Sequence, residues 1–179
     1  MTSVYHDSLS KFAARDYAPD MAGFIKKLFR IGKLPADMRT QAEAEGIIHL
    51  TDCIGVWARF TGQIPGRRSV GLTRGYGGAL VLTNERVLAT VGAVPGQSGR
   101  AVDQPWTAPK SGAVEGTLSE AGLVLDIADL SRVDPQFSGT FSLTFKTELT
   151  ADELMRLPTR TIAFDVPPTF VYRVLGVPR

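Results

Sequence analysis

The spacing of apolar residues near the start of the chain predicts an amphipathic helix from Pro19 to Ile31. Its apolar positions recur at i, i+3, i+4, i+7 and i+8, and basic residues occupy the opposite face. Pro19 suits a first helical turn, and Gly32 suits the stop. Such a helix either docks on the rest of the fold or lies in a membrane interface, and the short linker that follows it favours docking. The apolar stripe consists of Met21, Phe24, Ile25, Leu28 and Phe29.

A second helix is predicted over 36–45, directly after Pro35. This segment is rich in Ala, Glu, Gln, Met and Arg, which are good helix formers, and Gly46 is placed to cap it. Its apolar face is thin, so we expect a surface helix. Residues 1–45 are therefore interpreted as a helical extension that packs on the domain formed by 46–179.

After Gly46 the pattern changes to short apolar runs separated by turns, which is typical of β-strands. The clearest alternation is in 139–147, where every second residue is apolar. The hairpin 78–91 is instead apolar on both sides of the turn 83–86, which predicts a central position in the sheet with little exposure. The other expected strands are 47–50, 55–60, 69–74, 101–106, 113–119, 123–128 and 160–166, and the expected buried residues are Leu80, Leu82, Val87, Leu125, Phe141, Leu143 and Phe145.

Two short helices are predicted near the end of the chain. Thr150 and Glu153 have the spacing of a capping box, and Pro158 stops the helix that they open. A last helix is expected over 169–175. Together these elements predict a mainly β (α+β) fold: an antiparallel barrel of about seven or eight strands, with helices before it and a short helix after its strands.

Composition indicates an ordinary globular chain. Its 179 residues are 44% hydrophobic and 21% charged, and the formal charge of +2 is too small to indicate nucleic-acid binding. The single cysteine, Cys53, excludes an internal disulfide and has the apolar neighbours of a buried, inert thiol. No signal peptide and no run of about 18 apolar residues is found. The expected location is cytoplasmic, with peripheral attachment to the inner membrane surface as the alternative.

Residues that carry enzyme chemistry are few and scattered. His6 and His49 are far apart, and no His or Cys pair has the spacing of a zinc site, so neither a metal nor another cofactor is expected. Asp126 and Asp129 could share a site, although carboxylates at a strand end more often cap a turn. No catalytic residue is therefore assigned.

Four arginines form the best polar candidate for a site. Arg59, Arg67, Arg68 and Arg74 lie on two predicted strands and the loop between them, where they could hold an anion by charge-assisted hydrogen bonds. The alternative is that they only keep this rim soluble. Trp57 and Trp106 are expected in the core; the alternative is that they stack at the barrel surface or plug its ends.

The hairpin from Gly78 to Ala89 resembles the Gly–apolar–Leu–Thr–x–x–Arg–apolar hairpin of bacterial pleckstrin-homology-like (GRAM-like) domains. Leu34-Pro35, Glu45-Gly46-Ile47 and Pro65-Gly66-Arg67 are similar to the lead-in of that family, and the similarity covers about residues 34–157. The resemblance implies a partly open barrel capped by a helix and used to bind lipid head groups or proteins. Lipid-binding members of that family carry basic residues on the first two strands. Here the corresponding basic residues are Arg59, Arg67, Arg68 and Arg74, on the two strands and the loop between them.

The resulting expectation is a non-catalytic PH-like binding or interaction module for an anionic ligand or a protein partner at the inner membrane surface. Two alternatives stay open. A barrel that holds a small apolar ligand requires a cavity between its sheets, and an enzyme requires His49, Cys53 or a carboxylate pair to converge in a pocket. Whether side chains fill the barrel interior separates the first alternative from surface binding.

Overall fold

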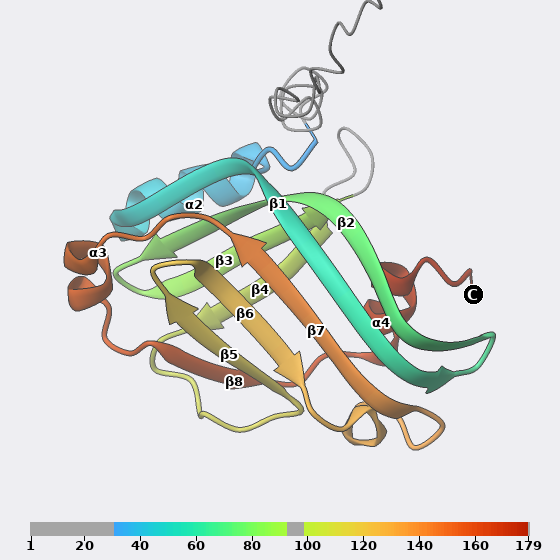
Figure 1. The fold of residues 1–179 in the computed structure, drawn as a ribbon. Helices are drawn as coiled ribbons and strands as arrows, with labels where there is room; N and C mark the ends of the chain where they lie inside the picture. Colours follow the sequence, from blue (N-terminus) through green and yellow to red (C-terminus); the bar gives the residue numbers. More distant parts are fainter. Residues whose placement is uncertain (1–30, 93–98, 179) are drawn as a thin grey trace, which may run out of the picture.

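The structure is a computed structural model that describes residues 31–92 and 99–178 (Figure 1). Eight antiparallel strands form one sheet that curls into a nearly closed barrel, in the order β4-β3-β2-β1-β7-β6-β5-β8. This confirms the predicted mainly β barrel. The helix predicted over 19–31 lies outside the described residues, apart from its last position.

The strands are β1 (Ile47–Ile64), β2 (Arg67–Thr83), β3 (Arg86–Gly92), β4 (Gly99–Pro105), β5 (Val114–Ser119), β6 (Gly122–Ile127), β7 (Ser138–Lys146) and β8 (Thr161–Phe164). The helices are α2 (Ala36–Glu45), the short 3-10 helix η1 (Leu130–Arg132), α3 (Ala151–Arg156) and α4 (Pro168–Leu175). Among the described residues, no helix has the length and apolar character needed to cross a membrane.

Two strands are much longer than predicted. The separate segments 47–50 and 55–60 belong to one strand of 18 residues, β1, and 69–74 joins the hairpin strand in β2, which has 17 residues. The polar residues after Leu50 indicated a break, but they form a β-bulge, where the register with β2 shifts between Thr51 and Ile54. Cys53 has a φ of 58° there, which is unusual for a residue with a side chain.

The bulge is held by the segment that leads into α2. The N–H of Cys53 donates to the carbonyl of Gly32 at 3.1 Å, and Asp52 Oδ1 accepts from the N–H of Leu34 at 2.8 Å. Asp52 also pairs with Arg39 on α2. Cys53 itself is half-buried instead of fully buried, because the bulge turns this residue out of the regular pleat.

The barrel interior is filled by side chains from all eight strands and from α4. All seven residues predicted to be buried are at most 3% exposed, and they belong to one contiguous apolar cluster. Trp106 is buried as expected, and its Nε1–H donates to the carbonyl of Thr83 at 2.9 Å. For Trp57 the core expectation is wrong and the surface alternative holds. It is 42% exposed and alternates with inward residues on β1, so its ring lies on the outer face, across Gly75 of β2.

The β2–β3 hairpin is buried on both faces, as predicted. Its inner face joins the barrel core, and α2 covers its outer face with the side chains of Met38 and Ala42. The thin apolar stripe of α2 is therefore enough to cover two strands. The hairpin is not at the centre of the sheet, however, because β4 is the only strand between β3 and the sheet edge.

Both C-terminal helices are confirmed. Thr150 and Glu153 make the two hydrogen bonds of a capping box at the start of α3. The helix α4 packs on the end of the barrel near the β1–β2 turn (Figure 1). The hydroxyl of Tyr76 on β2 donates a hydrogen bond to the carbonyl of Val174, and the rings of Phe137 and Tyr172 pack nearly perpendicular to each other with 5.2 Å between centroids.

Candidate functional site

Arg59 and Arg74 do not share a site. Arg59 lies opposite Thr73, and Arg74 lies opposite Ala58, one position along the same pair of strands. Ala58 faces the core, so the alternation of side chains places Arg74 on the inner face of the sheet and Arg59 on the outer face. The guanidinium of Arg74 lies against Gly176, just beyond α4. The predicted set of four is therefore divided between two faces.

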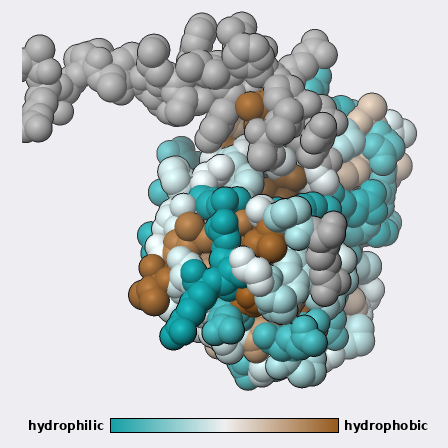
Figure 2. Space-filling model, turned by 90° about the vertical axis from the view of Figure 1, so that its right-hand side faces the viewer, coloured by the Kyte–Doolittle hydropathy of each residue, from teal (hydrophilic) through white to brown (hydrophobic). Residues whose placement is uncertain are grey.

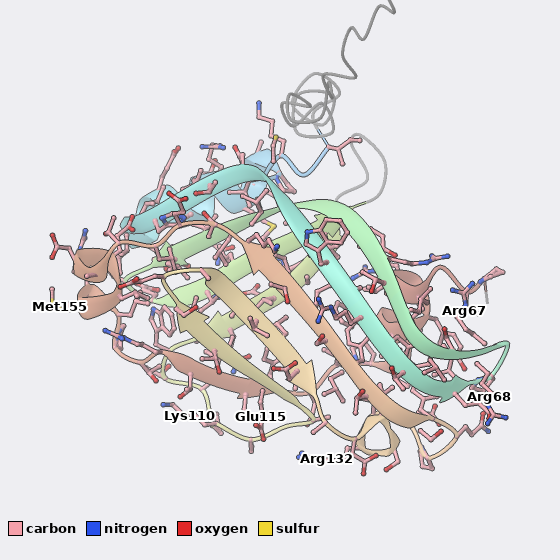
Figure 3. The ribbon with its side chains drawn as sticks, in the orientation of Figure 1. Arg67, Arg68, Lys110, Glu115, Arg132 and Met155 are labelled. Atoms are coloured by element: carbon pink, nitrogen blue, oxygen red, sulfur yellow. The ribbon has the colours of Figure 1, made fainter. Side chains whose placement is uncertain are left out.

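Arg67 and Arg68 are together at the far end of the β1–β2 hairpin (Figure 3). A tight turn at Pro65-Gly66 joins the strands, with Gly66 at a φ of 82°, a conformation that glycine adopts without strain. Arg67 is half-buried opposite Ile64, and Arg68 is exposed. These two are the members of the set that lie at the hairpin end, where the alternation of β2 directs their side chains to opposite faces.

A bulge next to this pair was not predicted. Thr61 alone lies between the paired positions of β1, whereas Val70 and Gly71 both lie between those of β2. Gly71 has a φ of 69° and its N–H donates to Thr61 Oγ1 at 2.9 Å, which leaves Val70 89% exposed. A glycine inside a strand pattern was the available signal. Figure 2 looks at this end of the molecule, where apolar and strongly polar groups lie side by side.

The two ends of the sheet, β4 and β8, do not pair with each other, and a groove of about 440 Å³ lies between them. We call it the seam groove. It is lined by β4, by the chain that leaves β8, and by α4. Phe164, Val166 and Phe170 make it apolar, while Asp165 and Arg173 are charged. This volume is within the usual range of ligand pockets.

The charged groups of the seam groove are partly engaged. Arg173 lies 5.6 Å over the ring of Phe170 and donates to the carbonyl of Arg100 at 3.2 Å. Asp165 Oδ1 accepts from the N–H of Ala113 at 2.8 Å. Of the five guanidinium N–H donors of Arg173, the described residues take up one by a recorded hydrogen bond.

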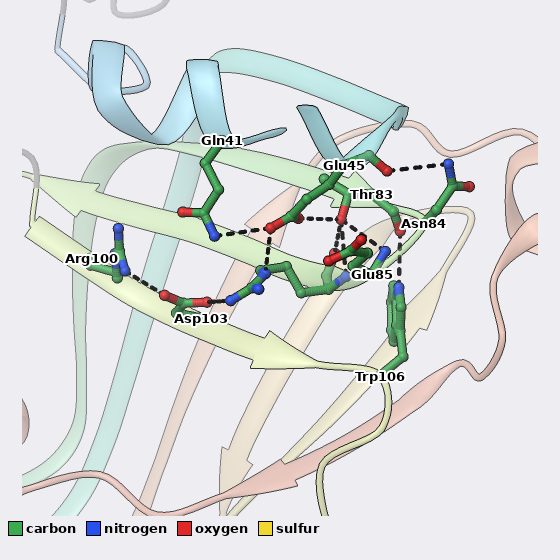
Figure 4. Close-up of polar contacts among 9 residues, drawn as sticks. Gln41, Glu45, Thr83, Asn84, Glu85, Arg100, Asp103 and Trp106 are labelled. Carbon is green, nitrogen blue, oxygen red and sulfur yellow. Dashed lines mark hydrogen bonds and ion pairs between the residues drawn. The ribbon is translucent and has the colours of Figure 1, made fainter. Parts of the chain in front are cut away.

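Asp103, on the β4 side of the groove, belongs to an ionic network centred on Arg86 (Figure 4). Arg86 Nη1 lies 3.0 Å from Asp103 Oδ1, and its Nε forms a close ion pair with Glu45 at 2.8 Å, without the alignment of a hydrogen bond. Arg100 pairs with the second oxygen of Asp103. The hydrogen bond to Asp103 raises the pKa of Arg86; burial opposes this and the charge of Glu45 supports it. The network joins α2, β3 and β4.

A second groove, of about 410 Å³, lies on the outer face of β1, β7 and β6. Arg59, Ser142 and Asp126 form one row across these strands. Burial raises the pKa of the Asp126 carboxyl, and the charge of Glu115 on β5 adds to this effect. Asp129 is separate from this groove: it caps η1 by accepting from the N–H of Ser131 at 2.9 Å. The turn-capping reading is therefore confirmed for Asp129.

His49 connects β1 to α3. Its Nδ1 lies 3.0 Å from Glu153 Oε1, and its Nε2 lies 2.7 Å from Thr51 Oγ1. The imidazole is 9% exposed, and both of its nitrogens already have partners. Neither of the two grooves is lined by His49, Glu153 or Thr51. The arrangement therefore holds α3 against the barrel, and Cys53 also lies outside both grooves.

We expect Glu153→Gln to remove a pH-dependent part of the stability. The N–H of Thr150 lowers the pKa of Glu153 below its ordinary value of 4.5, with support from His49 and against the effect of burial. Because the folded-state pKa is the lower one, this stabilisation is complete above pH 4.5 and is lost as the pH falls through the folded-state value. Urea unfolding should show a deficit of about 0.3–1 kcal/mol for the variant at neutral pH, which shrinks in acid. Glu148→Gln, at an exposed position, is the control, and a deficit that persists in acid would contradict the assignment.

No group of three or more His, Cys, Asp or Glu side chains suited to a metal ion is found in the described residues. Comparison with protein-family models, with curated proteins and with solved structures finds no match to the chain. Inference about function therefore depends on the geometry of the hairpin end and of the two grooves.

Proposed function

We propose that this chain is a non-catalytic interaction module that attaches to an anionic lipid surface by the end of its β1–β2 hairpin. The observation that carries the proposal is Val70, which is 89% exposed on its bulge within a few residues of Arg67 and Arg68. An exposed apolar side chain beside basic ones matches an interface in which acyl chains lie under negative head groups. In this proposal the chain is cytoplasmic and binds peripherally at the inner membrane surface.

Two further features support a surface site. The interior of the barrel is filled by residues such as Phe60, Leu82 and Phe145, so a small apolar ligand has no place among these core side chains. The resemblance of residues 34–157 to bacterial PH-like (GRAM-like) domains agrees with binding of head groups or proteins. Arg67 and Arg68 lie next to the hairpin turn, whereas Arg59 and Arg74 lie further along the strands, so we assign the lipid contact to Arg67 and Arg68 and leave the other two outside it.

The proposal predicts salt-sensitive binding to vesicles of phosphatidylcholine that contain phosphatidylserine. Each arginine near an anionic surface contributes about 1 kcal/mol, so Arg67→Ala with Arg68→Ala should weaken binding about 30-fold at low salt. Val70→Asp should also weaken it, because a carboxylate would replace the apolar tip. Co-sedimentation at low and high salt measures both effects.

The matched controls lie elsewhere on the molecule. Met155→Asp changes the other strongly exposed apolar residue, 69% exposed, at the opposite end of the barrel (Figure 3). Arg132→Ala removes a basic residue from η1, away from the hairpin end. Both controls should bind vesicles like the unchanged chain. Equal binding by the Arg67→Ala/Arg68→Ala variant, or an equal loss in the controls, would rule out this site.

A further inference from the structure

The direction of the main-chain groups along β4 can be worked out from the neighbouring turn. The N–H of Arg86 donates to Thr83 Oγ1 at 2.9 Å and so points to β2, whereas the carbonyl of Glu85 accepts from the N–H of Trp106 at 2.9 Å. In an antiparallel ladder, successive residues direct their main-chain groups to alternate sides. The main-chain N–H and C=O of the next residue, Val87, therefore point to β4.

The same alternation identifies which groups of β4 face the seam groove. The main-chain groups of Val87 and Ala89 point to β4, so those of their partners Gln104 and Val102 point to β3. Asp103, between them, must direct its N–H and C=O away from β3 and into the groove. Beyond Val102 the register with β3 shifts by one residue, because Ala101 is the extra residue of a bulge, and this brings Arg100 to the outer side as well.

The outward direction of this edge agrees with an observed contact. The carbonyl of Arg100 accepts from Arg173 of α4 across the seam groove at 3.2 Å. The remaining seam-facing groups, the N–H of Arg100 and the N–H and C=O of Asp103, have no strand beside them in the described fold, since β4 is the last strand of the sheet. A row of donors and acceptors of this kind is matched by another extended main chain.

We propose that the seam groove binds an extended segment of a partner protein, which adds to β4 as a ninth strand. One apolar side chain of the segment contacts Phe164 and Phe170, and one carboxylate pairs with Arg173, most of whose guanidinium donors have no hydrogen-bond partner among the described residues. An acidic group is favoured because Asp103 is already paired with two arginines and Asp165 already accepts from Ala113.

The walls of the groove favour a single segment over a second copy of this chain. A symmetric dimer through β4 would place a whole sheet edge against β4. Here α4 and the chain from Phe164 to Pro167 form the opposite wall, and Arg173 reaches across to β4. The space is therefore walled on both sides, and one strand fits it better than another barrel does. This inference is independent of the proposed lipid contact, which lies on the β1–β2 hairpin.

The test uses the full chain and a random peptide library displayed on phage. Selection should enrich peptides that combine alternating apolar residues with Asp or Glu. Synthetic copies of these peptides should slow hydrogen exchange at the amides of Arg100 and Asp103, because both N–H groups would gain a main-chain acceptor. Arg173→Ala should weaken binding roughly tenfold or more, as expected for loss of a hydrogen bond to a charged group.

Thr169→Trp gives a second, steric test. Thr169 is exposed on α4 and lines the groove, so the indole fills the groove without disturbing the core. This variant should lose peptide binding and keep vesicle binding. Thr73→Trp, at an exposed threonine on the outer face of β2, should keep both.

Three results would overturn the proposal. They are a selection that enriches no peptide, peptides that bind Thr169→Trp as well as the unchanged chain, and a concentration-dependent dimer in sedimentation that Thr169→Trp abolishes. The last result would assign the groove to a second copy of the chain. Vesicle binding tests only the lipid contact at the hairpin end, and peptide binding tests only the seam groove. Either proposal can therefore be refuted without affecting the other.

Discussion

Phe145→Ala should lower the free energy of unfolding by about 3–5 kcal/mol, the largest loss that we expect from one substitution in this chain. Phe145 is fully buried on β7, between Val56 of β1 and Leu123 of β6, which are also fully buried. Truncation removes most of an aromatic side chain, and neighbours on three hydrogen-bonded strands cannot move in to fill the space. Urea unfolding followed by circular dichroism measures the change.

Lys146→Ala is the matched control for Phe145→Ala. Lys146 is the next residue of β7 and is exposed, so its truncation should change the free energy of unfolding by less than about 0.5 kcal/mol. A variant Phe145→Leu, which keeps much of the volume, should lie between the two. Equal stability of Phe145→Ala and Lys146→Ala would show that the inner face of β7 is assigned wrongly.

Arg86→Ala should be the most damaging change among the charged residues, at about 2–3 kcal/mol. The side chain of Arg86 is 24% exposed and forms ion pairs with both Glu45 and Asp103. The side chain of Glu45 is only 9% exposed. Without the guanidinium, the Glu45 carboxylate stays largely buried, and within the described part of the chain it keeps Gln41 and Thr83 as its hydrogen-bond donors. Breaking a fully buried pair costs more, and the partial exposure of Arg86 explains the lower value expected here.

A double-mutant cycle separates this network from simple loss of packing. If the cost of Arg86→Ala comes from the unpaired charge of Glu45, then adding Glu45→Gln should restore part of the stability, because the neutral amide leaves no buried charge. Arg68→Ala, at an exposed arginine on the hairpin, should cost less than about 0.5 kcal/mol. Additive effects of Arg86→Ala and Glu45→Gln would mean that the ion pair does not contribute.

The features that sequence predicted well are those with a local pattern. Alternation identified the inner face of β7, and apolar residues on both strands identified a hairpin covered on two faces. The capping box of α3 needs only the spacing of Thr150 and Glu153. The continuity of β1 was missed because Thr51 and Asp52 interrupt the apolar run before Cys53, whereas the contact of Cys53 with Gly32 holds this stretch as a bulge.

The candidate sites were harder to predict because they depend on pairing between distant segments. The arginines were grouped by their closeness in sequence, and the pleat sends Arg59 and Arg74 to opposite faces. The seam groove joins β4 to α4, and no periodicity in either segment indicates that they meet. The exposure of Val70 depends on a bulge whose position is set by the register of β1 with β2. Only the glycine that follows Val70 pointed to it.

The pairing of β1 with β7 has a consequence for the chain as it is being made. Most other pairings join strands that follow one another in the chain, and β5 waits for β8 over a shorter span. The second edge of β1, along Gly55–Gln63, waits longest, for Ser138–Lys146. Roughly 80 residues separate these partners, so at about 5–20 residues per second the edge of β1 stays open for on the order of 4–16 seconds. During that time a long, half-apolar strand on the ribosome lacks its partner, which makes the nascent chain most exposed to wrong pairing before β7 emerges.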